Sequence, residues 1–217
     1  MIVVIDGPAG SGKSSTARAV AGKLQIQFLD SGALYRVATL VYLDTEKDYH
    51  AFFEKFNKSK ISFHFKNERF HVYLNDEDVT DAIREMEVSE HVSEVASNPK
   101  IRREVNDLMR EVVKHDIYIA DGRDLGTAVF PDAELKFFMN ADLDTRAQRR
   151  YRELKQEGQD VSLEEIKENL AQRDEMDSNR AADPLKKAED AIEIDTSACS
   201  FEEQVSIICE KISKRIN

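Results

Sequence analysis

A glycine-rich segment near the start of the chain carries the residues best suited to bind a phosphate. It fits the pattern G-x-x-x-x-G-K-[ST] and ends in Lys13 and Ser14. Glycines let the backbone curl so that successive N–H groups point at phosphate oxygens, and the helix that follows adds partial positive charge. We expect Lys13 to bridge the β- and γ-phosphates of a nucleoside triphosphate and the Ser14 hydroxyl to ligate Mg²⁺. The predicted triphosphate-binding residues are Gly7, Pro8, Ala9, Gly10, Ser11, Gly12, Lys13, Ser14 and Ser15.

A GTPase is the first alternative for such a loop, and the sequence argues against it. A GTPase should carry an N-K-x-D motif in which the Asp accepts hydrogen bonds from guanine. The nearest string, at residues 57–60, reads Asn-Lys-Ser-Lys and lacks that Asp. It also precedes a predicted hairpin rather than following a core strand.

Arginines near predicted strand ends suggest a second anion site. Arg36 follows a short strand-like run, and Arg123 lies just past another, where ligands of open α/β sheets bind. On a helix, Arg173 and Asp177 share one face, and Arg180 stands three residues beyond Asp177. Two guanidiniums beside a carboxylate could hold a phosphate and a sugar hydroxyl together. A solvated, salt-bridged helix face is the alternative interpretation of the same residues.

Short apolar runs alternate with helical patterns along most of the chain. Apolar stripes at helical spacing follow the first two runs, which is the strand–helix alternation of an α/β fold with a parallel sheet. Asp121, directly after the third run, has the position of a Walker-B acid. The predicted buried strands are 2–5, 26–29, 117–120, 135–139 and 191–194.

The pattern changes after about residue 57. Apolar and polar residues alternate over 61–65 and 70–74 across a turn at Asn67-Glu68, which predicts an antiparallel hairpin. We therefore expect an inserted lobe at about 58–98, with helical stretches around 80–97 and again from Pro99. A basic helix is expected over 142–154. Capping boxes, Ser162 with Glu165 and Ser200 with Glu203, should begin two later helices.

Composition limits the class of protein. The 217 residues are 41% hydrophobic, enough for one core, and we expect a single domain over 1–217. The net charge of −11 argues against a nucleic-acid or anionic-membrane partner, because both require a basic field. The N-terminus lacks the pattern of a signal peptide, and no run approaches the ~18 apolar residues of a membrane span. Cys199 and Cys209 are expected to be reduced thiols, and the chain a cytoplasmic monomer.

Taken together, these motifs resemble those of the bacterial cytidylate (CMP/dCMP) kinases. The match covers most of the chain, in family order from residue 2 to about 205. The most diagnostic segments are Asp121-Gly122-Arg123-Asp124 with Phe130-Pro131-Asp132-Ala133, and Arg173-Asp174-Glu175-Met176-Asp177-Ser178-Asn179-Arg180. The other matching segments are 6–14, 29–36, 75–80, Pro184-Leu185 and 194–196.

The resemblance implies a three-layer P-loop NTPase fold with a parallel core sheet, here of five strands. The antiparallel hairpin lobe would bind CMP, and a short lid at about 153–166 would close over the site. Lys13, Arg123, Arg180 and Arg149 would be catalytic. The CMP-binding residues carried over by motif are Ser31, Arg36, Ser93, Arg102, Arg123, Asp124, Arg173, Asp177 and Arg180.

Within that set the resemblance implies distinct roles. Ser93, Arg102 and Asp124 would read the cytosine edge, whereas Arg36, Arg123 and Arg180 would hold the acceptor phosphate. Arg173 and Asp177 would hold the pentose hydroxyls. The implied reaction moves the γ-phosphoryl of ATP, with Mg²⁺, to CMP or dCMP. Two alternatives stay open: a P-loop kinase of another small acceptor, such as UMP, AMP or shikimate, and a non-catalytic ATP-binding switch.

Overall fold

A parallel sheet forms the centre of the computed structural model, which describes residues 1–66, 69–156 and 158–216. Its strands are β1 (Ile2–Asp6), β2 (Gln27–Asp30), β6 (Tyr118–Gly122), β7 (Leu135–Asn140) and β8 (Ile192–Asp195). Within the described residues these five strands pair in the order β2-β6-β1-β7-β8, and every pairing is parallel. This confirms the predicted α/β class and the predicted buried strands, with ends shifted by one or two residues.

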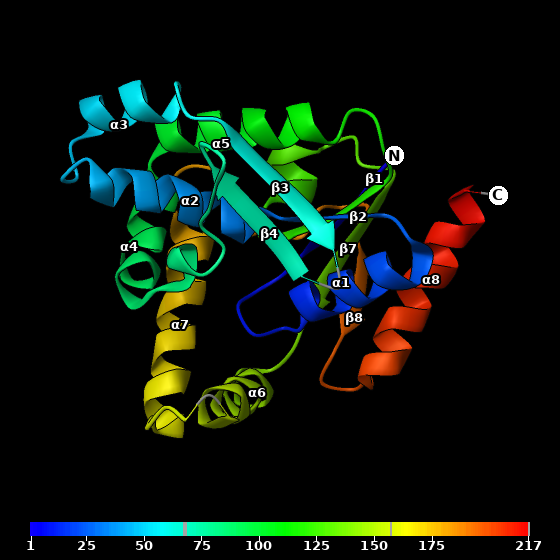
Figure 1. Cartoon of the computed structure of the whole chain (residues 1–217). Helices are drawn as coiled ribbons and strands as arrows, with labels where there is room; N and C mark the ends of the chain where they lie inside the picture. The colour runs from blue at the N-terminus through cyan, green and yellow to red at the C-terminus, as the bar shows by residue number, and fades with distance from the viewer. Residues whose placement is uncertain (67–68, 157, 217) are drawn as a thin grey trace.

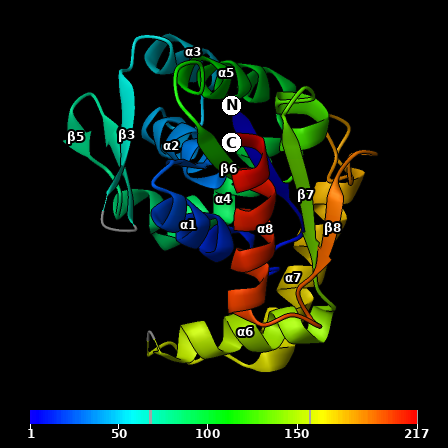
Figure 2. The same cartoon turned by 90° about the vertical axis from the view of Figure 1, so that its right-hand side faces the viewer.

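Helices cover both faces of the sheet (Figures 1 and 2), with α1 and α8 on one face and α2, α4 and α5 on the other. The first helices are α1 (Lys13–Leu24), α2 (Ser31–Asp44), α3 (Tyr49–Phe56), α4 (Met86–Ser97) and α5 (Pro99–Val112). The later helices are α6 (Leu143–Gln156), α7 (Leu163–Asn179) and α8 (Phe201–Ile216). Two short turns complete the set, a 3₁₀ turn η1 (Ala82–Arg84) and a π-helical turn η2 (Leu125–Val129).

A second, antiparallel sheet contacts the edge strand β2, and its strands β3 and β5 lie at the left of Figure 2. It contains β3 (Ile61–Lys66), β4 (Arg69–Leu74) and β5 (Glu77–Asp78). Phe28 of β2 meets the rings of Phe65 and Phe70 edge-on, at centroid distances of 5.4 and 5.8 Å, and these contacts fix the small sheet to the core. The hairpin prediction is confirmed, although the turn predicted at Asn67-Glu68 lies outside the described residues.

Two elements of this region were not expected from the sequence. β5 is only two residues long, too short to show a pattern. Helix α3 did leave a signal, because Tyr49, Phe52, Phe53 and Phe56 follow helical spacing and Asp48 caps the first turn by accepting from the Ala51 N–H. Phe52 is completely buried against Tyr42 and Phe56, so this helix packs into the main core.

The C-terminal half contains the predicted capping boxes. Ser162 and Glu165 exchange hydrogen bonds at the start of α7, and Ser200 and Glu203 do so before α8. The lid expected at 153–166 corresponds to the end of α6, a connection and the start of α7; its residue Glu157 lies outside the described residues. In the described ranges, Cys199 and Cys209 form no disulfide. No helix of the described chain is long and apolar enough to cross a membrane.

The register of the parallel sheet brings the functional segments together. Asp6 at the end of β1 lies opposite Gly122 of β6, and Asp30 of β2 lies opposite Asp121. The carboxyl ends of parallel strands meet at one edge, where ligands of such sheets bind. The glycine-rich loop after β1 and the arginine-bearing loop after β6 are therefore neighbours.

Candidate active site

The glycine-rich loop joins β1 to α1 in a conformation that needs its glycines. Gly12 has a φ of 89°, in the left-handed region that favours glycine. At Gly7 an added Cβ would come within 2.0 Å of the carbonyl oxygen of Met139 on β7. Lys13 is buried and donates to the Pro8 carbonyl at 3.0 Å, which folds its ammonium back over the loop. The loop thus has the strand–loop–helix context that the phosphate-binding motif requires.

Asp121 and Ser14 form the part of the site that fits a divalent cation. The Ser14 hydroxyl donates to one carboxylate oxygen of Asp121, and among the described residues the other, buried oxygen has no hydrogen-bond partner. Burial, together with the negative charge of Asp30, raises the pKa of Asp121 to about 6. A hydroxyl beside an unsatisfied carboxylate oxygen suits Mg²⁺, which takes few protein ligands and fills its remaining positions with water and substrate phosphate.

The charge around Lys13 marks a place for an anion. Burial and then the positive charge of Arg123 lower the pKa of Lys13 to about 7, and Arg173 acts in the same direction. Burial and Arg123 also lower the pKa of Arg173. Three cations held this close repel one another, and a bound phosphate would relieve that repulsion. Lys13 belongs to the glycine-rich loop and the two arginines to the other predicted site, so the anion would lie between them.

Helix α6 and the β8–α8 connection brace the glycine-rich loop from outside. Arg146 of α6 is buried and donates to the carbonyls of Ala9 and Ala141, each at 3.0 Å. Thr196 donates to the Ser11 carbonyl at 3.0 Å, and Arg149 holds Thr196 through two further bonds of 2.9 and 2.6 Å. Arg149, predicted to be catalytic, therefore stands next to the loop.

Asp124 is the centre of an ion-pair cluster. One carboxylate oxygen accepts from Arg102 and the other from Arg180, at 2.5 Å for Arg180. Arg102 also donates to Asp183 at 2.9 Å, and its guanidinium lies 5.3 Å from the ring centroid of Tyr35. Burial raises the pKa of Asp124, and the two arginines oppose that shift. We call Arg102, Arg123, Asp124, Asp177, Arg180 and Asp183 the Arg–Asp network.

Asp177 connects Arg123 to Arg180 within this network. The segment 173–180 was expected to place it between Arg173 and Arg180. It pairs with Arg180 at 3.8 Å, and more tightly with Arg123 at 2.9 Å, while its charge opposes the lowering of the Arg173 pKa. Helix α7 ends at Asn179, and Arg180 turns back as its C-cap residue to reach Asp124. A solvated helix face is therefore the wrong interpretation of Arg180, whose side chain is 8% exposed.

The other predicted acceptor residues lie around this network at different distances. The Ser31 hydroxyl donates to the Asp121 carbonyl at 2.6 Å, so it stands at the same sheet edge. Arg36 instead donates through Nη1 to the Ile83 carbonyl and to the Ser89 hydroxyl at 2.8 Å. These bonds tie α2 to η1 and α4. Ser93 is half-buried on α4, and Ser15 is exposed on α1.

Some residues of the site were not expected from the sequence. Three of them contact arginines more than 45 positions away in the sequence: Arg102 contacts Tyr35 and Asp183, and Arg149 contacts Thr196. The carbonyl of Asp183 also accepts from nearby Arg180 across a local turn. Tyr35 and Thr196 lie in the segments 29–36 and 194–196 that carry the resemblance, which is the only sequence signal for them, and Asp183 lies outside every matching segment. Arg146 was seen only as part of a basic helix.

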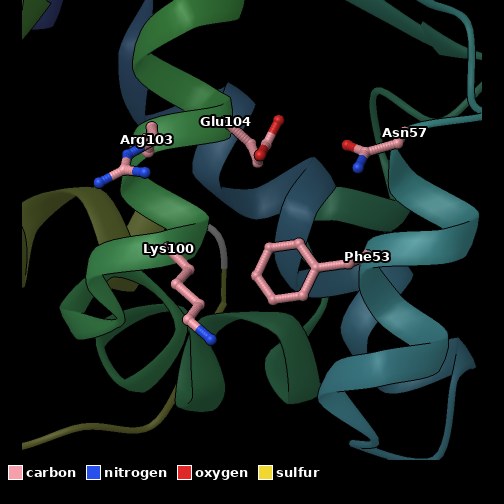
Figure 3. Close-up of a pocket in the computed structure, with 5 residues that line it drawn as sticks. All are labelled: Phe53, Asn57, Lys100, Arg103 and Glu104. Carbon is pink, nitrogen blue, oxygen red and sulfur yellow. The ribbon is translucent and has the colours of Figure 1, made fainter.

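A surface pocket of about 290 Å³ lies apart from these groups (Figure 3), between α3 and α5. Its lining residues are Phe53, Asn57, Lys100, Arg103 and Glu104. The ring of Phe53 points from α3 toward α5. The pocket shares no lining residue with the glycine-rich loop or the Arg–Asp network, and we assign it no part in the chemistry.

Comparison with known proteins agrees with the geometry. Residues 3–214 match the family model described as cytidylate kinase. A curated cytidylate kinase from Carboxydothermus hydrogenoformans is 41% identical over 99% of this chain and 98% of its own length. One from Streptococcus pyogenes serotype M5 is 43% identical over 99% of this chain and 97% of its own.

Solved structures of more distant proteins share the fold. TT1252 from Thermus thermophilus covers 100% of this chain and 98% of its own, with a TM-score of 0.51 at 18% identity. A gluconokinase from Sinorhizobium meliloti 1021 covers 99% of this chain and 97% of its own, with a TM-score of 0.50 at 11% identity. At these identities the likeness shows the fold alone.

Proposed function

Because the chain belongs to the cytidylate kinase family, we propose that it transfers the γ-phosphoryl group of ATP to CMP or dCMP, giving CDP or dCDP. The observation that carries this proposal is the course of β6 and the loop after it. Asp121 lies beside Ser14 of the glycine-rich loop, and Arg123 and Asp124, two and three residues later, belong to the Arg–Asp network. One strand end thus serves a donor site and an acceptor site.

On the donor side, this chain's own groups would bind and orient the triphosphate. The N–H groups of residues 7–14 would surround the phosphates, and Lys13 would exchange its bond to the Pro8 carbonyl for the β- and γ-oxygens. The Ser14 hydroxyl and the Asp121 carboxylate would hold Mg²⁺. When bound, this ion neutralises charge on the β- and γ-phosphates.

On the acceptor side, the arginines would hold the phosphate of CMP in line with the transferred group. Arg123 and Arg173 lie close enough to Lys13 to affect its pKa, so a phosphoryl group moving between the sites would remain among cations throughout. Arg36 uses Nη1 for its bonds to Ile83 and Ser89, and we propose that its Nε and Nη2 groups donate to the same phosphate. Catalysis of this kind depends on positioning and charge neutralisation rather than on a general base.

Asp124 accounts for the choice of cytosine. Arg102 and Arg180 each use one of its oxygens, and a carboxylate has further lone pairs to accept from the cytosine amino group. Uracil would present a carbonyl oxygen to the same carboxylate, and an acceptor facing an acceptor in a buried site is costly. We also propose that Ser93 and Arg102 bind the cytosine edge. Arg173 and Asp177 would bind the pentose hydroxyls.

The surrounding segments have roles in the same proposal. The lobe at about 58–98 would close on CMP. Arg36, which would bind the acceptor phosphate, is hydrogen-bonded to Ile83 and Ser89 of this lobe and so would link phosphate binding to its closure. The segment at 153–166 would act as a lid that excludes water, because an open site would hydrolyse ATP. Our proposal also includes action as a cytoplasmic monomer with no nucleic-acid partner.

The test is ADP release from ATP and Mg²⁺ with a panel of acceptors: CMP, dCMP, UMP, AMP, GMP and shikimate. We expect strong turnover with CMP and dCMP and little with the others. Faster turnover of UMP, AMP or shikimate than of CMP would show that the enzyme has a different phosphoryl acceptor. ATP binding with no acceptor-dependent release would favour the nucleotide-binding switch instead.

A further inference from the structure

Asp6 is a buried carboxylate that the reaction described above does not use. It is the last residue of β1 and directly precedes Gly7 of the glycine-rich loop. Only 4% of it is exposed. Both oxygens accept hydrogen bonds from distant backbone, Oδ1 from the Leu125 N–H at 2.9 Å and Oδ2 from the Gly126 N–H at 2.7 Å.

The two N–H groups that Asp6 holds belong to the residues directly after Asp124. These two residues begin the π-helical turn η2. The same turn holds the backbone of Asp124, because the N–H of Ala128 donates to the Asp124 carbonyl at 2.9 Å. The order of contacts is therefore β1, Asp6, η2 and Asp124. A π-helical turn is a rare backbone form that is frequent at functional sites.

The chemistry of this contact requires a carboxylate. Two adjacent N–H groups point at one side chain, and only a carboxylate accepts on both oxygens, whereas the amide of Asn has one acceptor and one donor. The contact is also unfavourable in one respect, since burial and the nearby charge of Asp124 raise the pKa of Asp6 to about 6. A carboxylate that is buried at this cost does more than fill the core, because it holds two backbone N–H groups of η2.

We propose that Asp6 is a positioning residue for acceptor choice: by holding η2 to the strand that begins the glycine-rich loop, it sets where the Asp124 carboxylate stands relative to the donor site. Asp6 itself does not touch the acceptor. This inference rests on the proposed function, because it assigns to Asp124 the reading of the base.

The structure provides a matched control at the other end of the same turn. Arg110 of α5 donates to the carbonyls of Ala128 and Val129, each at 3.0 Å. Arg110→Met therefore removes a side-chain contact with the last two residues of η2 and leaves the Leu125 and Gly126 N–H groups bound to Asp6, whereas Asp6→Asn disturbs the two N–H groups that directly follow Asp124. A turn that mattered only for stability would respond to both substitutions in the same way.

The experiment measures kcat/KM for CMP and for UMP in the wild type, Asp6→Asn and Arg110→Met, together with KM for ATP. We expect Asp6→Asn to narrow the CMP-to-UMP ratio by about tenfold, the effect of misplacing one buried hydrogen-bonding group. The KM for ATP should stay within about twofold, and Arg110→Met should keep the wild-type ratio. An unchanged ratio in Asp6→Asn, or an equal loss in both variants, would overturn the inference.

A second variant reaches the same contact from the opposite side. A Cβ added at Gly126 would lie 3.3 Å from Oδ2 of Asp6, 3.2 Å from Cδ of Lys136 and 3.3 Å from Cγ2 of Val4, all closer than an ordinary contact. Gly126→Ala should therefore weaken the bond to Asp6 without removing the carboxylate, and should narrow the ratio in the same direction. If Asp6→Asn does not fold, the CMP-to-UMP ratio of Gly126→Ala tests the inference instead. A wild type that fails to use CMP would refute the proposed function instead, which is a separate result.

Discussion

The ion pair between Arg146 and Asp174 leads to a sharp prediction about the glycine-rich loop. The two side chains meet at 2.6 Å across α6 and α7, and they are only 8% and 23% exposed. Arg146 is the residue that donates to the Ala9 carbonyl of the loop. Asp174 stands on α7 beside Arg173, so this pair connects α7 to the glycine-rich loop.

Replacing Asp174 with Asn would leave the Arg146 guanidinium buried without a carboxylate. Breaking a buried pair by removing one partner costs about 3–5 kcal/mol. Asp174 keeps some contact with water and Asn retains one acceptor oxygen, so we expect a loss of about 2–3 kcal/mol in the free energy of unfolding. For a chain of this size, that loss lowers Tm by about 4–12 °C. The KM for ATP should also rise, since the Ala9 carbonyl loses a fixed partner.

The same two helices provide a control pair. Lys167 of α7 binds Asp144 of α6, but the two side chains are 45% and 72% exposed, and exposed pairs contribute little. Urea unfolding of Asp174→Asn and Asp144→Asn, with the KM for ATP of each, separates the two pairs. Equal losses of stability in both variants, or an unchanged KM for ATP in Asp174→Asn, would refute the reasoning.

Four further predictions follow from single residues. Lys13→Ala should abolish turnover while the circular dichroism spectrum stays that of the wild type, and normal turnover by the folded variant would contradict its role at the phosphates. Asp124→Asn should narrow the CMP-to-UMP ratio of kcat/KM by about tenfold or more, because an amide can donate to the uracil carbonyl; an unchanged ratio would remove Asp124 from base recognition. Arg180→Ala should raise the KM for CMP and lower kcat, and finding neither would leave this arginine a purely structural partner of Asp124. Burial raises the pKa of Asp6 to about 6 from 3.8, so its contribution to stability is full below pH 3.8 and is lost as pH rises through 6. Urea unfolding should show the wild type losing about 1 kcal/mol more than Asp6→Asn between pH 5 and pH 7, and parallel profiles would contradict this.

The sequence predicted those parts of the fold that depend on local patterns. The apolar run before Gly7 and the helical stripe after Ser14 are determined by neighbours a few residues away, and both elements are present as β1 and α1. The same holds for the hairpin, in which His64 and His71 stand opposite each other as strict alternation requires. Helix α3 shows that one such signal, the spacing of its aromatic residues, was overlooked.

The pairings inside the site could not be predicted in this way. Asp124 was expected to read a base, but its two arginine partners stand 22 and 56 residues away along the chain. Asp177 shares α7 with Arg173, as expected, but its bond from Arg123, 54 residues away, has no signal in helical spacing. Such contacts depend on how α5, β6 and α7 pack, and helical spacing carries no information about that. The roles of these residues toward a nucleotide stay predictions.

The most direct test of the account follows the phosphoryl group itself. The protein would be incubated with Mg²⁺ and ATP labelled in the γ-phosphate, with and without CMP, and the labelled products would be separated. We predict label in CDP, at a rate that depends on CMP, with little released as inorganic phosphate. Label that appears as inorganic phosphate at the same rate with and without CMP, or that never reaches CDP, would contradict it.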